Sequence, residues 1–368
     1  MSSIAKRPDG QWRARYRDAA DKEHSRHFAR KVDAQGWLDQ VTAAVVTGQY
    51  VDPKAGRVTV RVYATAWEAS HVGREGTARI VDNALRLHLL PRLGDRPMAS
   101  VRRSDVQAMV KALSGRLAAG TVRNVYDVTA RVFSAAVEDR VIASSPCRRI
   151  LLPRVEDQEV EPATVEQVTA LAGAVTARYR ALVVLLAGSG LRIGEALGLK
   201  VTDVDFLRRT VRVERQRLQD GTVGPAKTAK SVRTVPLAQV VVDELAGHLA
   251  AGYGAGEALF TTAVGQPLTY RVWRKVWSEA QTKAKQDVGT HDLRHFTASA
   301  LIAGGASVKQ VQTVLGHSSA MITLRTYAHL WPGDDDRTRS VMDATLSVLR
   351  TGCGLDDLPS GVSAGQEA

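Results

Sequence analysis

The segment from Thr290 to Leu330 constrains the chain most strongly, because it concentrates polar side chains that can meet around one phosphate group. It contains the strings THDLRH (290–295), VLGHSS (314–319) and TYAHL (326–330). His291, Arg294 and His317 can all contact phosphate oxygens, and Tyr327 follows His317 by ten residues. A phenol near several cationic or polar donors is what phosphodiester cleavage by a tyrosine nucleophile requires. The remaining sequence must complete this site or deliver DNA to it.

The net charge of the chain is unevenly distributed. At 368 residues the chain is too long for one ordinary core, so two or three domains are expected. Residues 1–57 contain 11 Lys and Arg against 7 Asp and Glu, residues 58–155 contain 16 against 8, and residues 156–368 contain 23 against 23. The excess of +12 therefore lies in the first 155 residues. This asymmetry favours nucleic acid as a partner over a merely solvated basic face.

The sequence argues against a membrane, a secretory route and a structural metal. It contains no run of about 18 apolar residues, and its polar start, MSSIAKRPDG, is unlike a secretory signal. Cys147 and Cys353 form no CxxC or Cys/His arrangement, so neither a zinc site nor a disulfide framework is expected. We therefore expect a cytoplasmic protein.

The N-terminal segment, residues 9–31, predicts a small basic sheet. Apolar and basic side chains alternate along it, with Trp12, Ala14 and Tyr16 on one face and Arg13, Arg15 and Arg17 on the other. A helix is predicted from Val32 to Val46, followed by a linker at 48–58. Such a sheet can place its arginines in a DNA groove. The alternative is a small αβ module whose arginines are simply exposed.

Residues 59–140 have the pattern of a helical domain. Thr59 is a plausible N-cap for the first helix. Further helices are predicted at Thr77–Leu90, Ser104–Leu113 and Thr121–Asp139. The basic residues are almost all arginines, which bind phosphate in a bidentate geometry. We take Arg74, Arg79 and Arg123 as candidate DNA contacts, and place the next linker at 144–164.

From Pro162 the pattern is again mainly helical. Residues 179–199 predict a buried helix that breaks at two glycines and restarts. Two strands are predicted, Thr210–Glu214 and Arg233–Leu237, with a turn at Asp220–Gly221 between them. The predicted elements that follow are helices at Val240–Leu249 and Arg271–Ala284, the second with core residues Trp273 and Trp277. Residues 351–368 are expected to be disordered.

Five strings, in this order, resemble the motif series of the tyrosine recombinase, or phage integrase, family. They are GLRIGEALGL (190–199), PAKTAKSVRTVPL (225–237), HDLRH (291–295), LGH (315–317) and TYAHL (326–330). The resemblance covers 160–345. Its candidate groups are spread over the 136 residues from Arg192 to Tyr327, so the fold must assemble them.

The resemblance implies a phosphate grip made without a metal or another cofactor. Arg192 and Arg294 match the arginine pair that grips the scissile phosphate. His291 and His317 match the positions that hydrogen-bond the phosphate and assist proton transfer.

The resemblance also implies the reacting groups. Tyr327 matches the nucleophile, which forms a 3′-phosphotyrosine link and frees a 5′ hydroxyl. Lys227 matches the hairpin lysine that protonates the leaving oxygen, and Lys230 is a nearby competitor for that role. Glu195 matches an acidic position that orients site residues.

The implied fold is multidomain and mainly α. An arm-type DNA-binding domain with a three-stranded sheet and a helix is expected at 1–57, and a helical, SAM-like core-binding domain at 58–155. A mostly α catalytic domain with a small antiparallel sheet is expected at 156–350, and a flexible tail at 351–368. The final helix of this family often docks on a neighbouring protomer, although its apolar stripe of Val341, Ala344 and Val348 would also suit a core of its own.

Several residues have other interpretations. Arg192 could be a helix-end arginine paired with Glu195. His291 and His295 have the spacing of a metal pair, but no HExxH string or third ligand accompanies them, so no metal is expected. His295 and His329 are interpreted as packing or supporting groups. Residues 305–319 resemble a helix-turn-helix, which leaves a non-catalytic DNA-binding regulator as an alternative.

The resemblance therefore implies an integrase of a phage or mobile element that acts on double-stranded DNA attachment sites. Four protomers would exchange strands through a Holliday junction in a bacterial host. A DNA-bending host factor and an excisionase or directionality factor are the expected partners. The rival is a Xer-like or transposon-resolving recombinase, against which the arm-like module at 1–57 argues.

Overall fold

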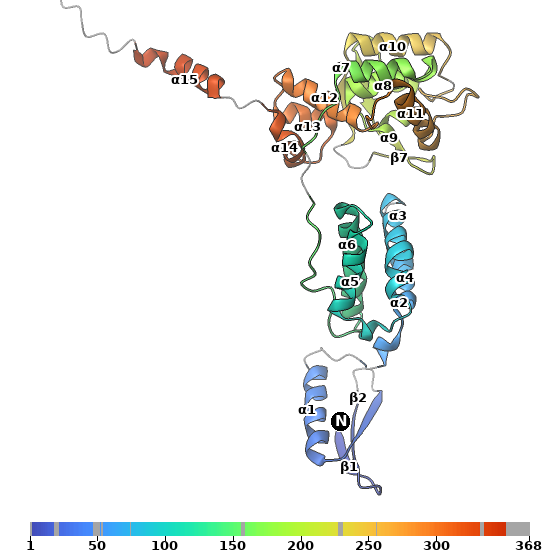
Figure 1. Ribbon diagram of the computed structural model, residues 1–368, viewed down its shortest axis with the longest axis vertical. Coiled ribbons are helices and arrows are strands. Elements are labelled where there is room, and N and C mark those ends of the chain that lie inside the picture. Colours follow the sequence, from blue (N-terminus) through green and yellow to red (C-terminus); the bar gives the residue numbers. More distant parts are fainter. Residues whose placement is uncertain are drawn as a thin grey trace, which may run out of the picture. The chain divides into compact units, whose positions relative to one another are not determined.

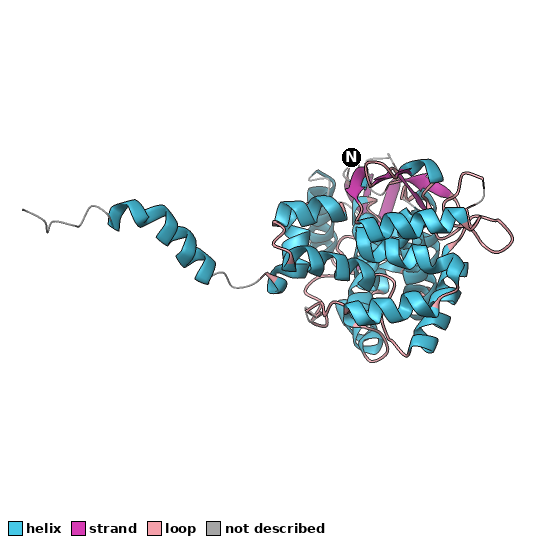
Figure 2. Cartoon of the chain, turned by 90° about the horizontal axis from the view of Figure 1, so that it is seen from above, coloured by secondary structure: helices cyan, strands magenta, loops and turns pink. Residues whose placement is uncertain are grey.

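The computed structural model describes residues 2–17, 22–46, 52, 54–73, 75–155, 159–226, 231–254, 256–331 and 335–350. The chain divides into two compact units, Met1–Asp157 and Gln158–Ala368, which are described separately (Figure 1). Helices predominate and the strands are few and short (Figure 2). The mainly α class expected from the sequence is confirmed. None of the described helices is long and apolar enough to cross a membrane.

The N-terminal sheet follows the predicted alternation. Strands β1 (Ser3–Lys6), β2 (Trp12–Arg17) and β3 (Glu23–Phe28) pair antiparallel in the order β1-β2-β3, and α1 (Lys31–Val46) packs on β2. Ala14 and Tyr16 are buried with Ala34 and Leu38 of α1. Because neighbouring side chains of a strand point to opposite faces, the arginines of β2 lie on the face away from this small core.

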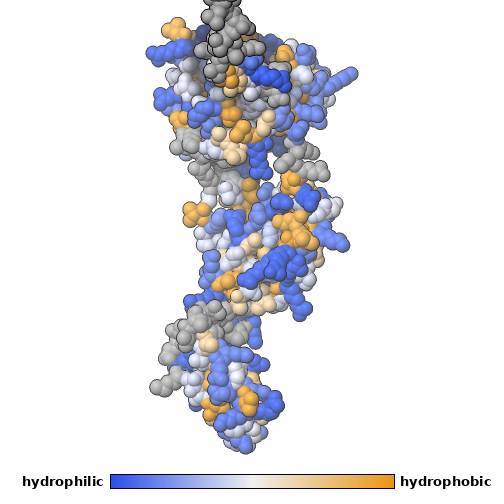
Figure 3. Space-filling model, turned by 90° about the vertical axis from the view of Figure 1, so that its left-hand side faces the viewer, coloured by the Kyte–Doolittle hydropathy of each residue, from blue (hydrophilic) through white to orange (hydrophobic). Residues whose placement is uncertain are grey.

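The helical part of the first unit has its own core. Its elements are η1 (Ala55–Arg57), α2 (Val60–Ser70), α3 (Glu75–Ala84), η2 (Leu85–Leu89), α4 (Leu90–Leu93), η3 (Met98–Ser100), α5 (Arg103–Ser114) and α6 (Ala119–Glu138). Thr59 caps α2 as predicted, since its side chain accepts from the Val62 amide. Val122 and Phe133 of α6 are fully buried with Leu85 and Leu89. On the molecular surface seen in Figure 3, most side chains are hydrophilic, and apolar side chains lie among them.

One long helix of this unit contains a wider turn. The predicted helix Thr77–Leu90 is longer than expected, because α3, η2 and α4 follow one another without a break, and η2 is a π-helical turn. Pro91, at the start of α4, has no amide hydrogen and its ring would clash with the carbonyl of Leu87 in a regular α-helix. The π turn accommodates the proline at this point.

The second unit is a helical body with a small sheet. Its helices are α7 (Val165–Ala174), α8 (Ala177–Ser189), α9 (Ile193–Leu197), η4 (Val201–Asp203), α10 (Gln239–Ala250), α11 (Tyr270–Ala284), α12 (Asp292–Ala303), α13 (Val308–Leu315), α14 (Ala320–Tyr327), η6 (Ala328–Leu330) and α15 (Asp335–Arg350). Helix α8 is buried on almost all sides because α7, α10 and α12 pack around it. Trp273 and Trp277 are core residues, as predicted. On α15, Val341, Met342 and Leu346 are exposed.

The strands of this unit form two small antiparallel sheets. Strands β4 (Val204–Asp205), β5 (Thr210–Val213) and β8 (Arg233–Pro236) form one, and β6 (Arg215–Arg217) and β7 (Val223–Pro225) form the other. The two predicted strands are present as β5 and β8. The turn at Asp220–Gly221 joins β6 to β7 rather than β5 to β8, because an additional short hairpin lies between the predicted strands.

A glycine in a left-handed conformation ends α8 and sets the position of the next helix. Gly190 has φ +64°, which favours glycine, and a Cβ there would lie 2.7 Å from Leu315 Cδ2. The helix therefore breaks where the sequence predicted, and Arg192 becomes the N-cap residue of α9. The predicted tail at 351–368 lies outside the described residues.

Candidate active site

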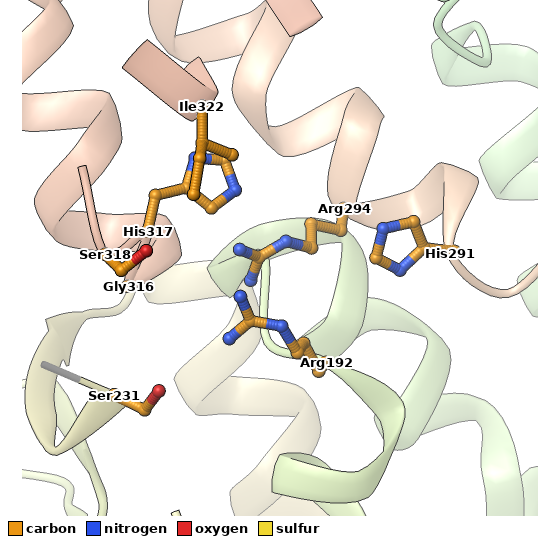
Figure 4. Close-up of a pocket in the computed structure, with 8 residues that line it drawn as sticks. All are labelled: Arg192, Ser231, His291, Arg294, Gly316, His317, Ser318 and Ile322. Carbon is orange, nitrogen blue, oxygen red and sulfur yellow. The ribbon is translucent and has the colours of Figure 1, made fainter. Parts of the chain in front are cut away.

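Two arginines from different helices point into one pocket of the second unit (Figure 4). Arg294 of α12 is almost fully buried, and its two terminal nitrogens donate to the carbonyl oxygens of Gly190 and Leu315, each at 2.6 Å. Arg192 is more open, with its side chain 32% exposed. Burial and the neighbouring Arg192 lower the pKa of Arg294, but its ordinary value is so high that the guanidinium stays charged. The pocket therefore has two fixed positive groups.

Two histidines stand on opposite sides of these guanidiniums (Figure 4). His291 lies at the start of α12 and His317 follows α13, with its Nδ1 2.9 Å from the Thr323 hydroxyl. Burial, then Arg294, lowers the pKa of His317 to about 4. His291 is exposed by its overall surface area, but partial desolvation, then the neighbouring His295, also lowers its pKa. Both imidazoles are therefore neutral at pH 7 in the free protein, and a bound anion would favour their protonation.

The pocket is lined by residues from separate parts of the second unit. They are Arg192, Ser231, His291, Arg294, Gly316, His317, Ser318 and Ile322. Four of the predicted site residues are therefore brought together. Within the described ranges, no group of three or more His, Cys, Asp and Glu side chains has the arrangement of a metal site.

Glu195 ties this pocket to the small sheet. Its carboxylate accepts from the Arg192 amide and guanidinium, each at 2.9 Å, and from two nitrogens of Arg233 at 3.0 and 3.2 Å. Arg233 also donates to the Val314 carbonyl at 2.8 Å. The helix-end pairing of Arg192 with Glu195 is thus present, and it orients Arg192 toward the pocket. The buried Arg233 therefore links Glu195 to the end of α13.

Arg233 was not among the predicted site residues. It is the first residue of β8, where Arg233 and Val235 point inward. The side chain of Arg233 is only 5% exposed. The alternation of the strand was the available signal, because an arginine in the inward register of a short strand must meet a buried partner.

Glu195→Gln should destabilise the fold. The substitution leaves Arg233 as a buried charge without its carboxylate, which typically costs about 3–5 kcal/mol. Burial alone would raise the pKa of Glu195, but the hydrogen bonds and charge of Arg233 outweigh it and lower the pKa. This contribution to stability is therefore present above the unfolded-state pKa of about 4.3 and is lost as the pH falls below it.

Urea unfolding of the wild type and Glu195→Gln at pH 7 and at low pH measures both effects. The difference in free energy of unfolding should shrink at low pH. Glu244→Gln is a matched control, since Glu244 makes an exposed ion pair with Arg180. Equal destabilisation by the two substitutions would contradict the role given to the buried pair.

Tyr327 lies beside the pocket rather than on its lining. It is the last residue of α14, is only 1% exposed and packs with Ala298 and Leu315. Its hydroxyl oxygen lies 2.7 Å from Nδ1 of His295, and its ring stacks with that of His317 at a centroid distance of 6.5 Å. Burial raises the pKa of Tyr327 to about 12, with Arg294 acting in the opposite direction. The phenol is therefore neutral in the free protein.

The described residues that line the pocket include none of the predicted lysines or DNA-binding arginines. Lys227, Lys230 and Arg74 lie outside the described residues. Among the arginines of the first unit, Arg13 forms an ion pair with Glu23 and Arg123 donates to the Pro153 carbonyl. Arg15, Arg17 and Arg79 also belong to the first unit, whereas the pocket lies in the second.

Comparison with known proteins identifies the family. The family described as "Phage integrase family" matches residues 160–332, and "Phage integrase central domain" matches residues 59–151. The tyrosine recombinase XerC of Mycobacterium bovis is 32% identical over 248 residues, which cover 62% of this chain and 78% of that protein. The chain belongs to the phage integrase family. It is thereby a tyrosine recombinase, an enzyme that transfers DNA strands, as the sequence motifs predicted.

Other relatives extend the similarity along this tyrosine recombinase. The integrase of Mycobacterium phage D29 is 28% identical over 317 residues, which cover 82% of this chain and 84% of that protein. The Tn1549 transposon integrase in complex with a circular intermediate DNA has a TM-score of 0.68 at 24% identity, covering 78% of this chain and 99% of that chain. A lambda integrase dimer bound to a COC′ core site has a TM-score of 0.61 at 16% identity, covering 97% of each chain. Both structures share the fold.

Proposed function

We propose that this recombinase is an integrase that cuts DNA with Tyr327, forms a 3′-phosphotyrosine link and frees a 5′ hydroxyl. The proposal rests chiefly on one observation: Arg192, Arg294, His291 and His317 line one pocket, and Tyr327 packs beside it in the same unit. The covalent link conserves the energy of the phosphodiester bond, so rejoining needs no ATP.

The two arginines hold the scissile phosphate in this mechanism. Attack on phosphorus concentrates negative charge on the non-bridging oxygens, and fixed cationic donors stabilise that charge without having to reorganise. Arg294 is already fixed by two carbonyl groups, and Arg192 by Glu195. The neutral imidazoles of His291 and His317 supply further hydrogen bonds to the phosphate.

The leaving 5′ oxygen needs a proton. We assign this role to Lys227, on the basis of the family motif in PAKTAKSVRTVPL (225–237). Ser231, four residues after Lys227 in the sequence, lines the pocket, which supports a role for this stretch of the chain at the phosphate.

The first unit would deliver the DNA. The excess positive charge of the chain lies within residues 1–155, and the arginines of β2 face away from the small core that β2 forms with α1. We assign residues 1–57 to distal arm sites and 58–155 to the core site flanking the cut. Arg13, Arg15, Arg17, Arg74, Arg79 and Arg123 are the proposed DNA contacts.

The active assembly would be a homotetramer that passes through a Holliday junction. The exposed Val341, Met342 and Leu346 of α15 support docking of this helix on a neighbouring protomer. A lambda integrase tetramer bound to a Holliday junction is among the structures that share the fold. We further propose a DNA-bending host factor and an excisionase as partners that set direction.

A resolving recombinase is the second candidate, since a Mycobacterium bovis XerC is a relative. The N-terminal sheet favours the integrase. The XerC similarity covers 62% of this chain, whereas the similarity to the phage D29 integrase covers 82%. A non-catalytic regulator is disfavoured because it would need neither the paired arginines nor Tyr327.

Covalent trapping tests the function directly. Genomic DNA of the source organism is nicked at random and incubated with the protein in EDTA, and protein–DNA adducts are isolated under denaturing conditions and sequenced. A nick beside the cut releases a short fragment and prevents rejoining, so the adduct accumulates. Recovery of one sequence that flanks a mobile element supports integration. Absence of any adduct would contradict the proposal.

Deletion of residues 1–57 should abolish binding to the distal arm sites and leave cleavage at the core site intact. The truncated protein should cut the recovered core site at close to the wild-type rate, because the pocket lies wholly in the second unit. Footprinting on the surrounding DNA should show loss of the distal protected sites. Normal recombination of two attachment sites by the truncated protein would instead favour the resolving recombinase.

A further inference from the structure

Within the described residues, the hydroxyl of Tyr327 is hydrogen-bonded to a histidine that was not predicted to be catalytic. His295 lies on α12, one helical turn after His291, and its Nδ1 is 2.7 Å from the phenolic oxygen. The His295 ring makes an edge contact with His291 at a centroid distance of 4.9 Å and another with Tyr327 at 5.6 Å. The rings of His291, His295 and Tyr327 are therefore in contact one after another, starting from His291 on the pocket lining.

The direction of this hydrogen bond follows from the chemistry of the two groups. Burial raises the pKa of Tyr327 and lowers that of His295, so both groups are neutral. An imidazole nitrogen is a much better acceptor than a phenolic oxygen, and a phenol is the stronger donor. The hydroxyl therefore donates to Nδ1, which leaves the ring hydrogen of His295 on Nε2.

We propose that His295 is the general base of the cleavage step, accepting the phenolic proton as Tyr327 attacks the phosphate. The phenolic oxygen forms a bond to phosphorus, the bond from phosphorus to the 5′ oxygen breaks, and the phenolic proton moves to Nδ1 of His295. The leaving oxygen takes its proton from a separate donor. When the 5′ hydroxyl attacks in the rejoining step, His295 returns its proton to the departing tyrosine. This inference rests on the proposed role of Tyr327 as nucleophile.

The neighbouring groups are less well placed for this role. His317 lies nearly parallel to the Tyr327 ring, and its Nδ1 is engaged by Thr323. His291 contacts the ring of His295. The terminal nitrogens of Arg294 donate to two carbonyl oxygens and have no lone pair to offer.

The charges around His295 keep it in the form that can accept a proton. Burial is the main cause of its lowered pKa, Asp292 opposes this effect and Arg294 adds to it. Within the described residues, the rings of His291 and Tyr327 also contact the His295 ring. His329 of η6 instead contacts the Val160 carbonyl. The base is therefore neutral, and active, at pH values above its lowered pKa.

His295→Ala and His295→Gln test the proposal in the full-length protein. The probe is a nicked duplex with the site recovered by covalent trapping, and the readout is the single-turnover rate of adduct formation. Loss of a general base typically slows a reaction by about 10²–10⁴-fold, and we expect both variants to fall in that range. Glutamine can keep a hydrogen bond to the tyrosine but cannot take its proton. Recovery of the rate by His295→Gln would therefore reduce His295 to a positioning residue.

The dependence on pH distinguishes base catalysis from a structural role. The wild-type rate should be level above the pKa of His295 and fall below it. Both variants should lose this plateau, with a rate that rises about tenfold per pH unit because they depend on the small fraction of ionised tyrosine. A profile of unchanged shape, merely displaced to lower rates, would overturn the proposal.

A modified substrate separates the two proton transfers. A 5′-phosphorothiolate at the cut has a leaving group that needs no acid, so it should not restore the His295 variants. DNA affinity should be unchanged in the variants, and His329→Ala should behave as the wild type. Faster cleavage by His295→Ala would overturn the proposal, because it would mean that His295 only restrains Tyr327. If the wild type forms no adduct, the proposed function fails. If the wild type forms the adduct and the His295 variants match its rate and pH profile, this inference alone fails.

Discussion

Tyr327→Phe is expected to abolish the covalent adduct while leaving DNA affinity unchanged. The phenyl ring can keep the packing against Ala298 and Leu315, so the fold should persist. The oxygen that would bond to phosphorus is absent, and removing a nucleophile typically lowers catalysis by on the order of 10⁶-fold. Denaturing gels of the nicked substrate measure the adduct, and a gel-shift titration measures the affinity.

Tyr253→Phe is the matched control for this experiment. The ring of Tyr253 packs against the guanidinium of Arg178, away from the pocket lining, so loss of its hydroxyl should not affect cleavage. An adduct formed by Tyr327→Phe at the wild-type rate would remove Tyr327 from the nucleophile role and require a different tyrosine or a different chemistry.

Arg294→Lys should combine a loss of cleavage with a loss of stability. One ammonium group cannot reach both the Gly190 and Leu315 carbonyl oxygens in the geometry of a guanidinium, so a buried acceptor loses its partner. Loss of a preorganised donor to the developing charge typically lowers the rate by about 10²–10³-fold. Single-turnover cleavage and urea unfolding measure the two effects.

Arg192→Lys provides the contrast. Arg192 is about one-third exposed, so cleavage should fall by a similar factor with a much smaller change in the free energy of unfolding. If Arg294→Lys cleaved DNA as fast as the wild type, the paired guanidiniums would not be the phosphate grip.

The sequence predicted those features that depend on local chemistry. Ordered strings around Arg192, Arg294, His317 and Tyr327 indicated one site, and the glycine-rich break after α8 was predicted at the right place. Strand alternation predicted the buried face of β2. These features follow from residue type and short spacing, which a single sequence contains.

The missed features depend on contacts between distant segments. Arg233 meets Glu195 across 38 residues, and His295 meets Tyr327 across 32. Nothing in the immediate surroundings of His295 distinguishes a histidine that faces a phenol from one that fills a core. The turn at Asp220–Gly221 was assigned to the wrong pair of strands because β6 and β7 have three residues each, too few for a clear alternation.

The buried guanidinium of Arg233 has a consequence for protein engineering. It joins β8, the first turn of α9 and the end of α13, and a Cβ at Gly316 would lie 2.8 Å from one of its nitrogens. A chimera that receives β8 from another recombinase therefore assembles this pocket only if the arginine, the glutamate and the glycine at these three positions are transplanted together. Specificity-swapping designs should treat these three positions as a single module.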